Sequence, residues 1–218
     1  MIFSTTRFTT SISESLGGNG NPSIPTGHGL VSGMEAALGH IGRPSSVEGI
    51  SVAIMGAGNV ANALTERLLD KNVGRVLVAD SNAEKVAAYN ARWEKKSGGR
   101  VHARVAPIGD YSILYEQVDV IAPCAVGGVI NKDTIPHIRA PIISGSANNT
   151  LKDDKKDDKL LRARGIRFAV DFIVNRMGIV LCSNEQYGNI HNDPAIYRHF
   201  DRENPEGIFQ CVKRSLEM

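Results

Sequence analysis

The chain has 218 residues, a formal net charge of +2 and 22% charged residues, which suits one domain of ordinary to large size with a buried core. This charge balance argues against nucleic acid or an anionic membrane surface as a partner, and no apolar run approaches the roughly 20 residues of a membrane-spanning helix. Three cysteines form no CxxC pair and six histidines show no metal-ligand spacing. We therefore predict no disulfide framework, no metal site and a reducing, cytoplasmic location.

The first 25 residues are predicted to be a loop-rich N-terminal segment, because glycines and prolines interrupt any long regular element. These residues are Gly17, Gly18, Gly20, Pro22 and Pro25. A helix is expected over 26–41, where apolar side chains recur at helical spacing, and Gly42 and Pro44 end it.

Residues 26–191 alternate between predicted strands and helices, which is typical of a domain with a parallel, doubly wound α/β sheet. The strands are expected over 51–55, 75–79, 101–105, 118–122, 141–143 and 166–170, and the helices over 59–71, 83–96 and 112–116. The charge run 152–159 balances its signs and is expected to be a solvated loop or helical turn. Residues 192–218 are predicted to form one or two terminal helices packing on this domain, with Pro205 at a helix start.

The segment from Val52 to Ala61 combines a buried strand, a glycine turn and the start of a helix. Gly56 permits a tight turn, and Gly58 lets the backbone approach a pyrophosphate without a Cβ in the way. The helix that begins near Asn59 would point free N–H groups and its positive dipole end at that anion. This order of elements predicts a dinucleotide site.

Asp80 ends the next predicted strand, about 20 residues after the glycine turn. A carboxylate at this place can accept hydrogen bonds from ribose hydroxyls and would repel a 2′-phosphate. Because Ser81 and Asn82 follow it, and no arginine does, we predict NAD as the cofactor. The contacts expected from this half of the site are Gly56, Gly58, Asn59, Val60, Asp80 and Ser81.

Small or amide side chains follow two of the later strands. Cys124 and Ala125 come after the strand 118–122, where small residues let a flat ring or a ribose lie close to the backbone. Cys124 could instead be a nucleophile, but no histidine is adjacent, so a residue lining the cofactor is the favoured interpretation. Asn148 and Asn149 could bind a nicotinamide carboxamide or cap the next helix, and we favour the cofactor role for Asn149.

Together these segments resemble the cofactor-binding Rossmann domain of the glutamate/leucine/phenylalanine/valine dehydrogenase superfamily, and its leucine-type branch more than its glutamate branch. Besides the glycine turn, the similarity lies in 17–29, 122–131 (APCAVGGVIN), 145–151 (GSANNTL), 174–175 and 185–188 (EQYG). The resemblance implies a reversible oxidative deamination with NAD as the cofactor. The small-molecule substrate would be an amino acid in one direction and a 2-oxo acid in the other. The cofactor contacts that the resemblance implies at this end of the site are Thr26, Cys124, Ala125, Asn149 and Asn175.

Two departures from the family pattern bear on function. Family enzymes have an earlier domain with a substrate-binding lysine, a catalytic lysine and a catalytic aspartate, and no lysine of this chain lies in such a context. Arg176 and Met177 follow Asn175, where the family tends to have small residues. We expect Arg176 to line the cleft as a cation for a carboxylate, and Met177 to be exposed there as part of an interaction patch with Ala125 and Val126.

Three hypotheses for function remain open. The favoured one is an NAD(H)-binding oxidoreductase of the amino-acid dehydrogenase type that takes its catalytic groups from a partner protein or from a second subunit of a homo-oligomer. The second is a stand-alone reductase of changed chemistry, in which Arg176 holds an acidic substrate and His28 donates a proton. The third is a non-catalytic NAD-binding sensor or scaffold.

Overall fold

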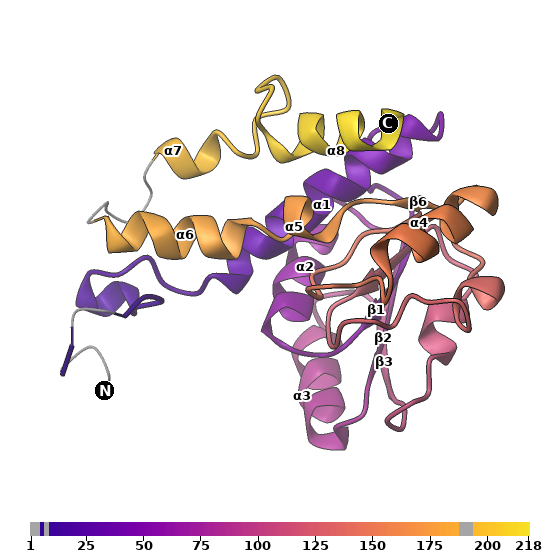
Figure 1. Cartoon of the computed structure of the whole chain (residues 1–218). Coiled ribbons are helices and arrows are strands. Elements are labelled where there is room, and N and C mark those ends of the chain that lie inside the picture. The colour runs from indigo at the N-terminus through magenta and orange to yellow at the C-terminus, as the bar shows by residue number, and fades with distance from the viewer. Residues whose placement is uncertain (1–4, 7–8, 188–193) are drawn as a thin grey trace.

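Six parallel strands form one sheet in the order β3-β2-β1-β4-β5-β6. The computed structural model describes residues 5–6, 9–187 and 194–218 of the chain (Figure 1). The strands are β1 (Ser51–Met55), β2 (Arg75–Asp80), β3 (Val101–Val105), β4 (Val120–Pro123), β5 (Ile142–Ile143) and β6 (Arg167–Phe168). The strand order reverses between β1 and β4, which is the switch point of a Rossmann sheet. The expected doubly wound parallel sheet is therefore confirmed.

Strands β1, β2, β4 and β5 contribute side chains to two separate cores. In β1, Val52 and Ile54 belong to one core and Ala53 to the other, because successive side chains of a strand point to opposite faces. By the same alternation, the side chain of Ile121 in β4 lies in the second core. Both faces of the sheet are thus covered at its centre, which explains why β1 and β4 are short apolar runs rather than alternating ones.

Different helices cover the two faces (Figure 1). The first core is closed by α1 (Ser23–His40), α2 (Asn59–Asp70), α3 (Ala83–Trp93) and the C-terminal α8 (Ile208–Glu217). The second core is closed by α4 (Asp154–Ala163) and by two short 3-10 helices, η3 (Ser112–Tyr115) and η4 (Ile135–His137). Within the described ranges, no helix has the length and apolar character needed to cross a membrane.

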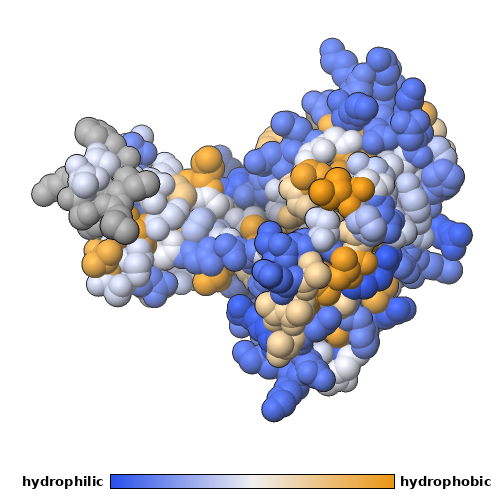
Figure 2. All heavy atoms as spheres, turned by 90° about the horizontal axis from the view of Figure 1, so that it is seen from below, coloured by the Kyte–Doolittle hydropathy of each residue, from blue (hydrophilic) through white to orange (hydrophobic). Residues whose placement is uncertain are grey.

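An arm extends from this body, and we define it as residues 9–22 with α6 (Met177–Gln186) and α7 (Pro194–Tyr197) (Figure 1). Glu185 on α6 holds the N-terminal segment, because its carboxylate accepts N–H groups of Ser11 at 2.5 Å, Ile12 at 3.1 Å and Asn19 at 2.9 Å. The segment includes one 3-10 turn, η2 (Glu14–Leu16). Apolar surface appears on both the arm and the body (Figure 2).

Two helix starts differ from the prediction. Helix α1 begins at Ser23 rather than at Thr26. Pro25 is tolerated in its first turn, because N–H groups there have no partner within the helix and the missing N–H of proline costs no hydrogen bond. Helix α8 begins at Ile208 rather than at Pro205, since the Gly207 N–H first closes a turn on the carbonyl of Asn204 at 2.8 Å. The expected boundary between residues 191 and 192 lies outside the described residues.

Candidate functional site

The glycine turn after β1 packs against the loop that follows β4. Gly56 has φ +108°, a conformation that residues with a Cβ rarely adopt. Its N–H donates to the Ala79 carbonyl at 2.7 Å, and a Cβ at this position would lie 3.0 Å from the Cys124 carbonyl oxygen. Glycine is therefore required here both by backbone conformation and by the close approach of two chain segments.

Gly58 has a different role, because the space beside it is open. It caps α2 in extended backbone conformation with no side-chain hydrogen bond at the cap, and a Cβ built on it meets no described atom within 4 Å. The first N–H groups of a helix lack intrahelical partners and carry its positive dipole end. The start of α2 at Asn59 and Val60 thus borders open space, and helix N-termini with free N–H groups are a common place for anions to bind.

Asp80, at the carboxyl end of β2, links that strand to the glycine turn. Its Oδ2 accepts the Ala57 N–H at 2.8 Å and its Oδ1 accepts the Asn82 N–H at 2.8 Å. A carboxylate has about four acceptor positions, so capacity remains for the hydroxyls of a ribose. The two backbone bonds hold the carboxylate beside the turn before any ligand binds.

A pocket of about 260 Å³ adjoins Asp80 and Ser81 at this edge of the sheet. Its apolar lining includes Ile108, which is 94% exposed, and Val126, which is 60% exposed. Exposed apolar side chains around a pocket of this size suit a flat ring such as adenine. No sequence motif singled out Ile108. Its place just after β3 was nevertheless a usable signal, because ligands of doubly wound sheets bind beyond the carboxyl ends of the strands.

The loops after β5 and α5 (Asp171–Val174) meet through amide side chains. Asn175 Nδ2 donates to Asn148 Oδ1 at 2.8 Å and to the Ser146 carbonyl at 3.2 Å. Asn149 is exposed and has φ +51°. The structure thus pairs Asn175 with Asn148, for which the sequence left both a capping role and a cofactor role open. Asn149 lies at the surface of the same loop.

Thr26 and Cys124 occupy more enclosed positions. Thr26 is buried in the first turn of α1, where its hydroxyl donates to the Pro22 carbonyl at 2.8 Å. The Cys124 N–H continues the β1–β4 ladder by donating to the Met55 carbonyl at 2.8 Å. Burial raises the pKa of the Cys124 thiol above its ordinary value, and hydrogen bonds with Ser146 only oppose this. A thiol in this state is a poor nucleophile, and Ala125 beside it is exposed.

Arg176 does not face the cleft as expected. Its guanidinium donates to the Glu206 carbonyl and lies 3.9 Å from Cys211 Sγ, so it packs against α8. The expectation of an exposed Met177 is also wrong, because its side chain is fully buried. Met177 instead belongs to the first core, which α1, α2 and α8 close. The expected patch therefore keeps only Ala125 and Val126 at the surface.

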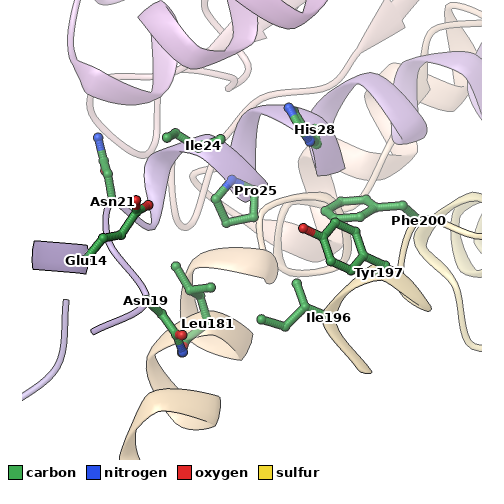
Figure 3. Close-up of a pocket in the computed structure, with 10 residues that line it drawn as sticks. All are labelled: Glu14, Asn19, Asn21, Ile24, Pro25, His28, Leu181, Ile196, Tyr197 and Phe200. Atoms are coloured by element: carbon green, nitrogen blue, oxygen red, sulfur yellow. The ribbon is translucent and has the colours of Figure 1, made fainter. Parts of the chain in front are cut away.

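His28 lies apart from these groups, in a different pocket formed by α1 and the arm. Its ring centroid is 5.8 Å from that of Phe200 in an edge-on arrangement. Burial and the positive charge of Arg67 lower the pKa of His28, so the imidazole is neutral at pH 7. His28 and Asp80 line different pockets, of which Figure 3 shows the one at His28, so the structure gives no shared site for these two groups.

Comparison with known proteins places these features in context. The family model described as Glutamate/Leucine/Phenylalanine/Valine dehydrogenase matches residues 17–215. The chain is 35% identical over 216 residues to leucine dehydrogenase of Geobacillus stearothermophilus, covering 98% of this chain and 55% of the relative. It is 34% identical over 183 residues to phenylalanine dehydrogenase of Lysinibacillus sphaericus, covering 84% of this chain and 46% of the relative. The chain thus spans about half the length of the curated relatives it matches.

Solved structures agree on the fold. L-tryptophan dehydrogenase from Nostoc punctiforme superposes with a TM-score of 0.76 at 26% identity, covering 90% of this chain and 53% of the other. Hetero-hexameric glutamate dehydrogenase from Thermus thermophilus gives a TM-score of 0.68 at 20% identity, covering 94% of this chain and 49% of the other. The second similarity is in fold alone, and in both cases the match covers about half of the solved chain.

Proposed function

Since the chain belongs to the glutamate/leucine/phenylalanine/valine dehydrogenase family, we propose that it binds NAD(H) at the carboxyl edge of its sheet and serves an amino-acid dehydrogenase reaction. The observation that carries this proposal is the open space at Gly58, at the uncapped start of α2 and on the same turn that Asp80 holds. A dinucleotide needs this combination: an anion site for the pyrophosphate and a fixed carboxylate for the ribose.

The remaining cofactor contacts are proposed from their place around the same edge. Asp80 and Ser81 would receive the adenosine half, with Ile108 and Val126 against the base. Cys124, Ala125, Asn149 and Asn175 follow later strands or helices, and Thr26 lies in the first turn of α1. We propose that these residues border the nicotinamide half of the site. The cofactor supplies the hydride acceptor, and these residues bind and orient it.

The reaction proposed for the complete protein is the reversible oxidative deamination of a small amino acid to a 2-oxo acid. The bound cofactor would supply the acceptor for the hydride from the substrate Cα, and hydrolysis of the resulting imine would give the 2-oxo acid and ammonium. A positioned base and a cation for the substrate carboxylate are needed. We propose that polypeptide outside these 218 residues supplies both, on a longer chain, a partner protein or another subunit.

Two placements weaken the alternative of a stand-alone reductase. The guanidinium of Arg176 packs against α8 and is not at the cleft, and His28 lines a different pocket. The two groups assigned to substrate and proton in that alternative are thus not assembled. A non-catalytic NAD-binding sensor or scaffold has the same cofactor site and remains the second candidate.

Calorimetric titration of the 218-residue chain with NADH and with NADPH tests the cofactor proposal. We expect NADH to bind at least tenfold more tightly, because Asp80 would lie against the extra phosphate of NADPH. Equal or tighter binding of NADPH would contradict the assignment. An assay with NADH, ammonia and a panel of 2-oxo acids separates the other candidates, since turnover by this chain alone would show that it contains the base and the cation.

A further inference from the structure

The pocket beside Asp80 has a second carboxylate in its lining, that of Asp110, which the proposed function does not use. Asp80 reaches the pocket from the end of β2, whereas Asp110 comes from the loop between β3 and η3. No lysine, arginine or histidine is among the described residues that line this pocket. An ionised carboxylate only accepts hydrogen bonds, so Asp110 favours a ligand group that carries an N–H or O–H.

A tight turn holds Asp110 at the pocket. The Asp110 N–H donates to the Pro107 carbonyl at 2.9 Å and closes a four-residue β-turn. Its third residue is Gly109 with φ +89°, which is the conformation that a type II turn requires at this position. The exposed Ile108 is the second residue of the same turn. One turn thus brings an apolar side chain and a carboxylate to the pocket, and its backbone is fixed before a ligand binds.

The carboxylate of Asp110 is charged and keeps capacity for a ligand. Its Oδ1 accepts the Ser112 N–H at 2.8 Å. Hydrogen bonds from the hydroxyl and the N–H of Ser112 hold the pKa of Asp110 below its ordinary value, and Arg104 adds a smaller effect in the same direction. A carboxylate has about four acceptor positions, so two bonds from Ser112 leave room for a donor of the ligand.

An adenosine offers donors at two separate places. Its ribose carries hydroxyls, for which Asp80 is proposed, and the adenine base carries an amino group at C6. The ring between these donors is flat and suits the apolar lining that Ile108 and Val126 provide. Because Asp110 lies on the same turn as Ile108, the group nearest to its carboxylate is expected to be the base and not the ribose.

We propose that Asp110 accepts a hydrogen bond from the 6-amino group of adenine and so makes the site selective for adenine over hypoxanthine. This inference rests on the proposed function, which places the adenosine half of NAD(H) in this pocket. Asp80 then binds the ribose and Asp110 identifies the base. In hypoxanthine a carbonyl oxygen replaces the amino group, and two acceptors would face each other at Asp110.

Two dinucleotides test the proposal: NADH and reduced nicotinamide hypoxanthine dinucleotide. They differ only at C6 of the base and in the hydrogen that hypoxanthine carries on N1. Titration calorimetry at pH 7 is expected to show NADH binding about tenfold more tightly, because the hypoxanthine compound loses a hydrogen bond to a charged group. Equal affinities, or tighter binding of the hypoxanthine compound, would overturn the proposal.

Two substitutions at Asp110 locate the selectivity. Asp110→Asn keeps the shape and the acceptor for the Ser112 N–H, but its amide can donate to a carbonyl as well as accept from an amino group. The preference for NADH should therefore fall to about twofold or less. Asp110→Lys replaces the acceptor by a donor, so it should reverse the preference. A preference that stays tenfold in both variants would contradict the assignment to Asp110.

Asp201→Asn is the matched control. Asp201 is exposed, and its Oδ1 accepts the N–H of Glu203 at 2.9 Å, as Asp110 accepts the N–H two residues further along. It does not line the pocket, so the full preference for NADH should remain. An equal loss of preference in Asp201→Asn and Asp110→Asn would show that the effect does not arise in the pocket.

The measured quantity is the ratio of two affinities in one sample, so a partly unfolded variant does not distort it. Circular dichroism of the same samples reports folding. Binding of neither dinucleotide to the unsubstituted chain would overturn the proposed function and this inference with it. Binding of both with equal affinity would overturn the role of Asp110 alone and leave the proposed function standing.

Discussion

Two aspartates at opposite ends of the sheet differ in whether space for a ligand remains beside their carboxylates. Asp119, just before β4, accepts the Ser51 N–H at 2.6 Å, the Ser51 hydroxyl at 2.7 Å and the Arg43 guanidinium at 2.6 Å. Asp80, at the end of β2, accepts two backbone N–H groups and also borders a pocket of about 260 Å³. The amino end of the sheet is thus closed by the chain itself, whereas the carboxyl end keeps space for a ligand.

The two aspartates differ in their surroundings rather than in their backbone contacts. Both aspartates stand at strand ends, and both bind backbone N–H groups. Only Asp80 lies beside an uncapped helix start and an open glycine. Substitutions at the two ends should therefore affect different measurements: cofactor binding at one and stability at the other.

The largest effect is expected from Gly58→Val. The new side chain would occupy the space proposed for the pyrophosphate, and we expect NADH affinity to fall by at least about 100-fold, or about 2.7 kcal/mol. The melting temperature should hardly change, because φ at Gly58 is −81° and a Cβ there meets no described atom within 4 Å. Calorimetry and circular dichroism measure the two quantities. Unchanged affinity in a folded variant would place the pyrophosphate elsewhere.

A smaller effect is expected from Asp80→Asn. The amide keeps an acceptor for the Ala57 N–H but removes the negative charge beside the ribose. We expect NADH to bind about tenfold more weakly and the preference over NADPH to shrink, because repulsion of a 2′-phosphate disappears. Parallel titrations with both cofactors measure the change. A preference that stays as large as in the unsubstituted chain would show that Asp80 does not set it.

Asp119→Asn is the matched change at the other end of the sheet. It should leave NADH affinity within twofold. The free energy of unfolding should fall by about 1 kcal/mol, because the hydrogen bonds from Ser51 and Arg43 would then reach a neutral amide instead of a charged carboxylate. Urea unfolding at pH 7 measures this loss. If the variant instead weakened NADH binding without changing stability, the contrast between the two ends would be wrong.

The stabilisation by Asp119 should depend on pH. Partial burial raises its pKa, but hydrogen bonds from Ser51 and the Arg43 guanidinium outweigh this and hold the pKa below its usual range. The stabilisation is therefore complete above the unfolded pKa of about 4 and is lost as pH falls through the lower folded pKa. Unfolding curves of the unsubstituted chain and of Asp119→Asn should converge in acid. A stability difference independent of pH would exclude this cause.

The smallest effect on cofactor binding is expected from Arg176→Ala. Its guanidinium binds the Glu206 carbonyl near α8, so NADH affinity should change by less than twofold. The free energy of unfolding should fall by about 1 kcal/mol through the lost hydrogen bond. Titration and thermal unfolding of the same sample decide this. A tenfold loss of NADH affinity would show that Arg176 acts at the cofactor cleft after all.

The sequence by itself determined the strand bounds at β1 and β3, the glycine turn and the acid at the end of β2. These features depend on neighbours in the chain: apolar runs, residues without a Cβ, and a carboxylate after a strand. The motif strings also identified the family, because the glycine turn and the APCAVGGVIN segment are specific in combination. Local signals of this kind need no knowledge of which helix packs where.

Only the tertiary structure decided the surroundings of Arg176, Met177 and His28. Whether the side chain of Arg176 points into the cleft or packs on α8 depends on the orientation of a single turn of chain. Contacts with α8 set that orientation, and α8 begins about 30 residues further along the sequence. Met177 is fully buried in a core that it shares with α1, which lies about 150 positions earlier in the chain, and with α8. Such contacts form only when distant elements pack, so no periodicity or spacing near residue 176 could reveal them.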